Sequence, residues 1–356
     1  MRSEVRGRAY SELVANFIVD VVCLHARLRR FRPLITNLYL TKRCNLRCRY
    51  CYPPGEEPNS DLQTLLTLLE KIRPHNPVIN ITGGEPLLYD DIVPILQRVR
   101  ELKFRPVLLS TNALCVDRII DHLHLIDHLI VSLDSLDEGV NDLMSGVAGT
   151  TPRILGAITR SAAVSREEGF KLTLHAVIAP ETLTSIEPIV EFCDALNISV
   201  SVSPEHGRFD PHAGLRNNPR YVQLIDRLVE LKRAGKPIAC STGYLRTIRE
   251  FSPHRCYPFV SPRVEPDGRV YFPCQRIRNR HVFLQDYKNL CELMRKEAEW
   301  IADTRCSERC FLACYLEVDQ YVNDPLPLVR EFPVRQYLVG RTGARETMVQ
   351  RGVIGG

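Results

Sequence analysis

The sequence shows little excess of either charge and no segment that directs a protein out of the cell. It has 47 Lys and Arg against 42 Asp and Glu, and a net charge of +5 is too small to indicate a nucleic-acid partner. Residues 1–6 lack the layout of a signal peptide. Together with an ordinary composition, 44% hydrophobic and 25% charged, this predicts a cytoplasmic globular protein.

A long hydrophobic run is also missing near the start. Apolar side chains between Tyr10 and Leu28 follow helical spacing, but polar residues interrupt them too often for a membrane span. One interpretation is an amphipathic helix, over residues 1–33, that packs on the protein's own core. The alternative is an interfacial helix whose following arginines contact anionic lipid, which would place the protein at the periphery of the inner membrane face.

Cysteine, in contrast, is abundant, with 13 residues. A disulfide scaffold is typical of small secreted domains and does not suit a chain of 356 residues with clustered cysteines. Reduced, metal-binding cysteines explain the clusters better. The isolated cysteines are interpreted as small buried hydrophobes; they are Cys23, Cys115, Cys193, Cys240 and Cys291.

The most informative segment is a loop, residues 44–51, which we call the cysteine loop. It places Cys44, Cys48 and Cys51 in a C-x3-C-x2-C pattern directly after a strand-like run. Thiolates suit iron–sulfur clusters or zinc. A [4Fe–4S] cluster usually takes four cysteines, so three would leave one iron open. Structural zinc needs four ligands, and no fourth Cys or His lies close by, so the spacing favours a cluster over zinc.

Strand-like and helix-like patterns alternate through the first two thirds of the chain. Strands are predicted over residues 36–41, 78–82, 106–111, 128–134, 171–179 and 198–204, with helices over 62–72, 92–102, 116–122, 153–168 and 186–196. Six such units indicate a parallel sheet with helices outside it, open or curled into a partial barrel. Functional residues in these folds gather at the carboxyl ends of the strands.

The second predicted strand runs into Gly83, Gly84, Glu85 and Pro86, which we call the glycine turn. With the cysteine loop and its aromatic residue Tyr50, this turn resembles the signature of the radical S-adenosylmethionine (SAM) enzymes over residues 34–205. The resemblance implies an α/β fold with a partial (β/α)6 barrel core and a [4Fe–4S] cluster held by the cysteine loop. It also implies SAM bound at the open iron and reductively cleaved to a 5′-deoxyadenosyl radical.

The same resemblance implies the residues of a SAM pocket. Gly83, Gly84, Glu85 and Pro86 would form its glycine turn, with Gly84 and the Glu85 carboxylate gripping the methionyl amine. Tyr50 would lie near the adenine. The polar ends of the third and fourth strands would line the pocket through Ser110, Asn112, Ser132 and Asp134. The electron would come from a donor such as ferredoxin or flavodoxin.

A second cysteine group follows residue 235 and consists of Cys256, Cys274, Cys306, Cys310 and Cys314. Two short strands around Pro266, Asp267 and Gly268 separate its first two members. This arrangement resembles the SPASM or twitch extensions, which implies a small C-terminal iron–sulfur domain with one auxiliary [4Fe–4S] cluster, structural zinc being the alternative. The predicted divisions are an N-terminal helix at 1–33, the core at 34–235, the auxiliary domain at 236–330 and a tail at 331–356.

The substrate is the least defined part. The layout is similar to adenosylhopene synthase-type enzymes, which implies a lipid or isoprenoid acceptor and peripheral membrane contact. A peptide is the alternative, although residues 1–33 are too short for a leader-binding winged helix. A carbohydrate or nucleoside also stays open, as does a non-enzymatic electron-transfer or scaffold protein, against which the glycine turn argues.

Overall fold

The computed structural model describes residues 33–51, 59–207, 210–278, 280–297, 299 and 310–323. The predicted N-terminal helix, Cys306 and the tail at 331–356 lie outside these residues. Within the described ranges, no helix is both long and apolar enough to cross a membrane.

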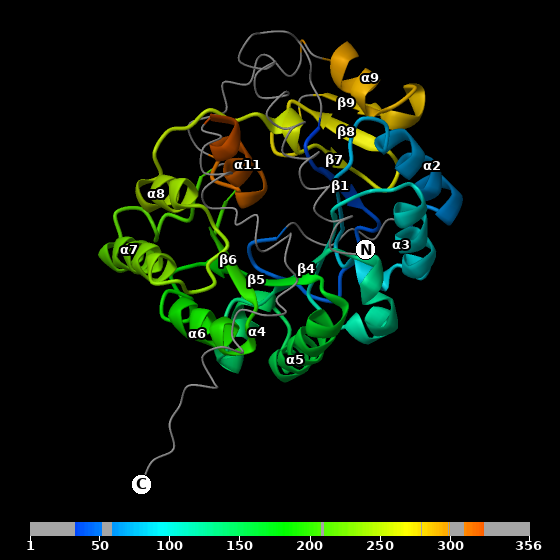
Figure 1. Ribbon diagram of the computed structural model, residues 1–356. Coiled ribbons are helices and arrows are strands. Elements are labelled where there is room, and N and C mark those ends of the chain that lie inside the picture. Colours follow the sequence, from blue (N-terminus) through cyan, green and yellow to red (C-terminus); the bar gives the residue numbers. More distant parts are fainter. Residues whose placement is uncertain are drawn as a thin grey trace, which may run out of the picture.

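The core is a parallel sheet whose first six strands follow one another in chain order. They are β1 (Thr36–Tyr39), β2 (Ile79–Thr82), β3 (Val107–Thr111), β4 (His128–Ser132), β5 (Lys171–Ile178) and β6 (Ser199–Pro204). Each pairs in parallel with the next, as in the register Thr36 to Ile79 and Asn80 to Leu108. Figure 1 shows the helices around the outside of this curved sheet. The predicted partial (β/α)6 barrel is confirmed.

Helices connect the strands and cover the outer face of the sheet. They are α2 (Leu62–Ile72), η1 (Pro86–Leu88), α3 (Ile92–Glu101), η2 (Val116–Leu125), α4 (Glu138–Ser145), α5 (Thr151–Glu168), α6 (Ile186–Leu196), α7 (Pro219–Arg233) and α8 (Thr242–Glu250). The predictions for α2 and α6 match to the residue. The segment predicted as a helix over 116–122 is a 3-10 helix, η2, and α4 and α8 were not predicted.

Local sequence explains where several helices begin and end. Asp61 caps α2 by accepting a hydrogen bond from the backbone N–H of Thr64, and Asn218 caps α7 in the same way. Gly146 and Gly169 end α4 and α5 in the left-handed conformation, with φ of 69° and 74°. These caps fix the lengths of helices whose apolar sides pack on the sheet.

The sheet continues beyond the barrel strands on the β1 edge. β7 (Arg263–Val264) pairs in parallel with β1, and the antiparallel strands β8 (Arg269–Phe272) and β9 (Arg280–Phe283) extend it further. The predicted hairpin around Asp267 is therefore confirmed, while its attachment to the core sheet was not predicted. The division at residue 235 stays a prediction. The remaining elements are η3 (Pro258–Val260), η4 (Leu284–Asp286), α9 (Leu290–Lys296) and α11 (Ala313–Asn323).

Candidate active site

The cysteine loop follows β1, and the glycine turn follows β2, so the two motifs meet at the carboxyl ends of neighbouring strands. The backbone N–H of Gly84 donates to the carbonyl of Thr41 at 2.8 Å, and that of Glu85 donates to the carbonyl of Arg43 at 2.8 Å. A Cβ atom on Gly84 would lie 2.2 Å from the Arg43 carbonyl oxygen. Glycine is therefore needed at this position for the turn to approach the start of the loop.

Helix α4 holds the other side of the cysteine loop. The backbone N–H groups of Arg47 and Arg49 donate to the carbonyls of Ser145 and Met144 at 2.9 Å and 3.1 Å. Gly146 follows in the left-handed region, and a Cβ there would lie 2.4 Å from the Arg47 carbonyl oxygen. The C-terminal end of α4 is thus a support of the site that the sequence interpretation missed. Asp137 at its N-cap and Gly146 at its end are the signals that could have revealed it.

The three thiols of the loop differ in exposure, since Cys44 and Cys48 are half-buried and Cys51 is exposed. Burial raises the pKa of Cys44, and burial followed by the charge of Asp134 raises the pKa of Cys48 to about 12. A thiolate in such a place needs a cation beside it, because coordination to a metal deprotonates a thiol. No group of three or more His, Cys, Asp or Glu side chains in the described part of the chain is arranged to hold a metal ion.

The sulfur of Cys44 has hydrogen-bond donors already in place. The backbone N–H of Leu46 donates to its Sγ at 3.4 Å, and Asn112 Nδ2 approaches it at 3.9 Å. Asn112 Nδ2 also donates to Asn45 Oδ1 at 2.7 Å, which fixes the amide between loop and strand β3. N–H groups aimed at a cysteine sulfur stabilise a metal-bound thiolate. The surroundings of Cys44 therefore suit a metal-bound thiolate.

The Glu85 carboxylate is held by hydrogen bonds within the protein. Its side chain is buried, and Oε1 accepts hydrogen bonds from Thr111 Oγ1 at 2.6 Å and from the backbone of Leu87 at 3.0 Å. Its Oε2 accepts from the backbone of Asn112 at 2.8 Å. Burial raises the pKa of Glu85. The carboxylate thus braces the ends of β2 and β3, and its predicted contact with the methionyl amine stays a prediction.

The predicted residues of β3 and β4 lie at the same edge. Asp134 is buried, and its carboxylate accepts from the Tyr50 hydroxyl at 2.7 Å and from the backbone of Val177 at 2.8 Å. Burial raises the pKa of Asp134 to about 6. Ser132 is exposed at the end of β4, whereas the Ser110 hydroxyl points along the sheet to another side chain. Contacts of Tyr50, Gly83, Gly84, Pro86, Ser110, Asn112, Ser132 and Asp134 with SAM stay predictions.

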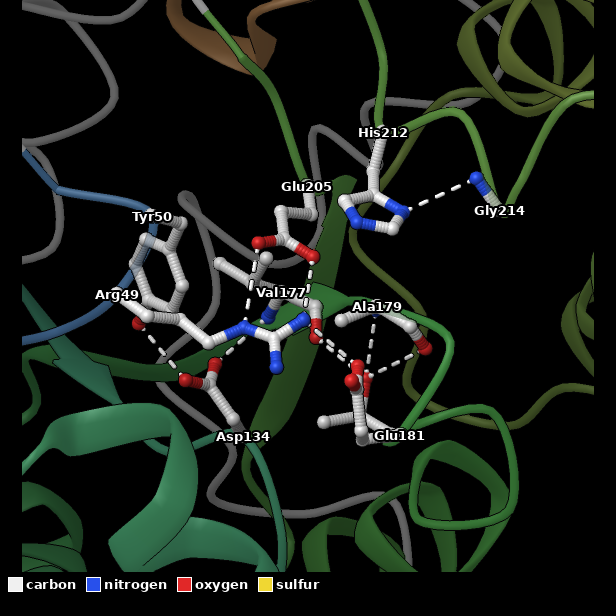
Figure 2. A network of polar contacts seen from close by, with 10 residues as sticks. Arg49, Tyr50, Asp134, Val177, Ala179, Glu181, Glu205, His212 and Gly214 are labelled. Carbon is white, nitrogen blue, oxygen red and sulfur yellow. Dashed lines mark hydrogen bonds and ion pairs between the residues drawn. The ribbon is translucent and has the colours of Figure 1, made fainter.

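An ion-pair network, absent from the sequence interpretation, clamps the loop to the far strands (Figure 2). Arg49 donates to both oxygens of Glu205 at 3.3 Å and 3.0 Å, and to Glu181 at 2.7 Å. The hydrogen bond from Arg49 lowers the pKa of Glu181. Glu205 follows β6 and Glu181 follows β5, so the arginine between Cys48 and Cys51 reaches across the barrel mouth. A separation of 156 residues between Arg49 and Glu205 leaves no local signal in the sequence.

Four members of the second cysteine group lie near enough to the buried Tyr315 of α11 for their charges to act on its hydroxyl. Burial, followed by the charges of Cys314, Cys274, Cys256 and Cys310, raises the pKa of Tyr315 well above its usual value. The sulfur of Cys274 accepts from the backbone N–H of Arg276 at 3.4 Å. No three of these thiols are arranged to hold a metal ion in the described part of the chain, so the auxiliary cluster, or zinc in its place, stays a prediction. Cys306 lies outside the described residues, so its predicted part is untested.

Fold and site together define a partial-barrel protein with a thiol-rich site at the carboxyl ends of its strands. Residues 38–193 match the Radical SAM superfamily. The chain is 30% identical over 159 residues to GTP 3′,8-cyclase of Aquifex aeolicus, covering 41% of this chain and 48% of that protein. It is 30% identical over 167 residues to pre-heme d1 synthase of Dinoroseobacter shibae, covering 44% and 39%. It spans about half or less of the length of these relatives.

Two solved structures share the fold. SuiB of Streptococcus suis bound to S-adenosylmethionine has a TM-score of 0.58 at 20% identity, covering 73% of this chain and 65% of that one. Native anSMEcpe with bound AdoMet also has a TM-score of 0.58, at 17% identity, covering 75% and 83%. These two structures share the fold alone, and residues 38–193 are the part of the chain that resembles the radical SAM enzymes.

Proposed function

We propose that this chain is a radical SAM enzyme whose cysteine loop holds a [4Fe–4S] cluster and whose neighbouring strand ends bind SAM. The observation that supports this most is the direct hydrogen bonding between the glycine turn and the residues that lead into the cysteine loop, from Gly84 to Thr41 and from Glu85 to Arg43. When bound and reduced, the cluster supplies one electron that breaks a C–S bond of SAM, giving methionine and a 5′-deoxyadenosyl radical.

The residues of the chain position these groups. Cys44, Cys48 and Cys51 would hold the cluster, with Asn112 and the backbone of Leu46 donating to the first sulfur. The glycine turn would meet the methionyl amine through Gly84 and Glu85, whose carboxylate is already held in place by Thr111 and Asn112. Arg49 and its two carboxylate partners hold the loop against β5 and β6.

Substitution of one loop cysteine tests the proposal. Cys48→Ala should lose the iron-dependent absorbance of the loop cluster and all formation of 5′-deoxyadenosine from SAM and dithionite under anaerobic conditions. Cys291→Ala is the matched control, because Cys291 lies in α9, and it should keep both signals. Full SAM cleavage by Cys48→Ala would refute the proposal, and wild-type protein that holds a cluster without cleaving SAM would favour an electron-transfer or scaffold protein.

We also propose an auxiliary [4Fe–4S] cluster at the second cysteine group and an electron donor of the ferredoxin or flavodoxin type. The four thiols around Tyr315 support the former. The lipid acceptor and peripheral membrane contact depend on residues 1–33, almost all outside the described residues. Co-sedimentation with anionic vesicles, with and without residues 1–30, tests them. A peptide substrate has indirect support, since a solved structure with this fold is SuiB bound to the precursor peptide SuiA.

A further inference from the structure

The two faces of the barrel sheet differ in chemistry. Side chains on the outer face, such as Leu38, Ile81, Leu109, Val131 and Leu174, belong to the buried hydrophobic core shared with the helices. Because side chains alternate along a strand, their neighbours point to the other face, into the barrel. Those neighbours, which we call the wall, are mostly hydrophilic, with Leu108, Ile130 and Val177 as aliphatic members and Lys171 as a charged one. The hydrophilic members are Asn37, Tyr39, Asn80, Thr82, Ser110, His128, Ser132, Thr173, His175, Ser199, Ser201 and Ser203.

On one side of the barrel, the lining is a series of amide and hydroxyl side chains joined by hydrogen bonds. The Ser110 hydroxyl donates to Asn80 Oδ1, Asn80 Nδ2 donates to Asn37 Oδ1, and Asn37 Nδ2 donates to Ser261 Oγ, each at 3.0 Å. The contacts cross β3, β2 and β1 in succession. They hold each side chain in one orientation, and each amide and hydroxyl keeps further hydrogen-bonding capacity.

On the other side the lining centres on His175. Its Nδ1 is 2.9 Å from Ser201 Oγ, and its Nε2 is 3.0 Å from Ser203 Oγ. Burial lowers the pKa of His175 to about 4, so the imidazole is neutral at neutral pH. The neighbouring pair of His128 Nε2 and Thr173 Oγ1 lies at 2.8 Å. This part of the wall therefore presents neutral donors and acceptors.

Few charges belong to the lining. Lys171 lies at the amino end of β5, away from the carboxyl ends where the cysteine loop sits. Arg263, next to β1, is paired with Glu265 at 2.6 Å. The wall leads to the candidate active site, because Ser132 ends β4 two residues before Asp134, which holds Tyr50 of the cysteine loop.

A hydrocarbon acceptor would suit this wall poorly. An apolar surface placed on it would remove water from amides and hydroxyls without replacing the lost hydrogen bonds. A site built from such groups discriminates strongly against ligands that cannot pair with them. We infer that the acceptor of the proposed radical chemistry is a hydrophilic molecule rich in neutral hydroxyl or amide groups, bound against His175, Ser201 and Ser203. This inference rests on the proposed function and replaces the predicted lipid acceptor.

The test separates acceptor classes by solubility. Reconstituted full-length protein, SAM and dithionite are incubated anaerobically with either the aqueous or the chloroform-soluble phase of an extract of the source cells, and 5′-deoxyadenosine is measured. The aqueous phase should raise its formation above the extract-free rate. Protease treatment of the aqueous phase then distinguishes two kinds of acceptor. The rise in 5′-deoxyadenosine would disappear for a peptide and remain for a small molecule such as a sugar or nucleoside.

Two results would overturn the inference: a rise with the lipid phase, or no rise with the aqueous phase. If no arm, including the extract-free one, yields 5′-deoxyadenosine, the proposed function fails, and the inference fails with it. A normal extract-free rate with a lipid-phase rise would reject the hydrophilic acceptor alone.

Variants of the wall add a second measurement. Ser203→Ala should reduce the aqueous-phase rise about tenfold, because one hydroxyl contact with the acceptor is lost. Ser165→Ala in α5 is the matched control, since it also removes one hydroxyl hydrogen bond, to the Phe170 carbonyl, and should leave the rise unchanged. His175→Leu should abolish the rise, and His175→Gln, which keeps a donor and an acceptor, should restore part of it. If the aqueous phase raises 5′-deoxyadenosine formation equally in wild type, Ser203→Ala and His175→Leu, the result would contradict binding of the acceptor to the wall.

Discussion

Polar side chains at the mouth of the barrel mainly hydrogen-bond to one another and so fix one another's positions. Glu85 accepts two hydrogen bonds, from Thr111 and Asn112, that join the ends of β2 and β3, and this places Asn112 opposite the first cysteine. Asn45 then holds the Asn112 amide from the loop side. The Glu85 carboxylate is therefore an internal brace whatever it binds besides, and the amide that it positions lies beside the first cysteine of the loop.

The Asn112 amide should tune the cluster of the loop. Asn112→Leu removes the N–H donor near Cys44 at similar side-chain volume, so the reduced, more negative cluster loses stabilisation. A net hydrogen bond worth about 1 kcal/mol corresponds to a midpoint potential lower by about 40 mV in a one-electron couple. Potentiometric titration followed by electron paramagnetic resonance measures this. Asn112→Gln is the control that keeps an amide, and equal potentials in wild type and Asn112→Leu would contradict the assignment.

His175 should make the stability of the fold depend on pH. Burial lowers its pKa from 6.5 to about 4 in the folded chain. Between these values the unfolded chain binds a proton that the folded chain does not, so the free energy of unfolding falls as pH drops through this window. Urea unfolding midpoints at pH 7 and pH 5 measure the effect. His175→Gln should weaken the dependence. His128 and His206, whose pKa values burial also lowers, contribute in the same direction, whereas Asp134, whose pKa burial raises, opposes them.

At the scale of elements, the alternation of strands and helices in the barrel could be predicted from the sequence, whereas the elements that support the candidate active site could not. Strands with buried residues at every second position, such as Leu38 on β1 and Leu109 on β3, show the two-residue period directly. Helix α4 is short and carries few apolar residues, so its spacing gave no signal. The pairing of Arg49 with Glu205 depends on how β6 closes the barrel, which no local pattern encodes.

The glycine turn should tolerate no side chain at Gly84. Gly84→Ala places a Cβ 2.2 Å from a backbone oxygen, which must force the turn and the cysteine loop apart at a cost of roughly 2 kcal/mol. Iron retention and thermal unfolding should both fall. Gly156→Ala in α5 is the matched control, because its Cβ would meet only the end of Arg160 at 3.3 Å. It should be neutral or slightly stabilising, and equal behaviour of the two variants would contradict the close approach.

For the whole molecule, the metal content distinguishes the two interpretations of the second cysteine group. Reconstituted wild-type protein should carry about eight irons as two four-iron clusters. Cys274→Ala should reduce this to about four, because Cys274 is one of the thiols around Tyr315. Iron and zinc analysis checks both numbers. A wild-type content near four irons with one zinc would favour the structural zinc site.

The architecture of the whole chain could be predicted only in part from the sequence. The order of β1 to β6 follows from six repeated units, and the hairpin around Asp267 follows from its turn residues. The pairing of β7 with β1 joins residues more than 220 positions apart. Because both strands are short, neither has a sequence pattern that indicates its partner strand. The substrate wall became visible only once the register aligned His175 with Ser201.

The junction of β7 with β1 also has a consequence for shortened forms of the protein. In the described sheet β7 covers the flank of β1 that β2 leaves open. A chain ending before Arg263 would expose the backbone N–H and carbonyl groups of that flank, which would then pair with other molecules. The C-terminal hairpin thus protects the barrel from self-association, so its removal should yield aggregates even though every barrel strand is retained.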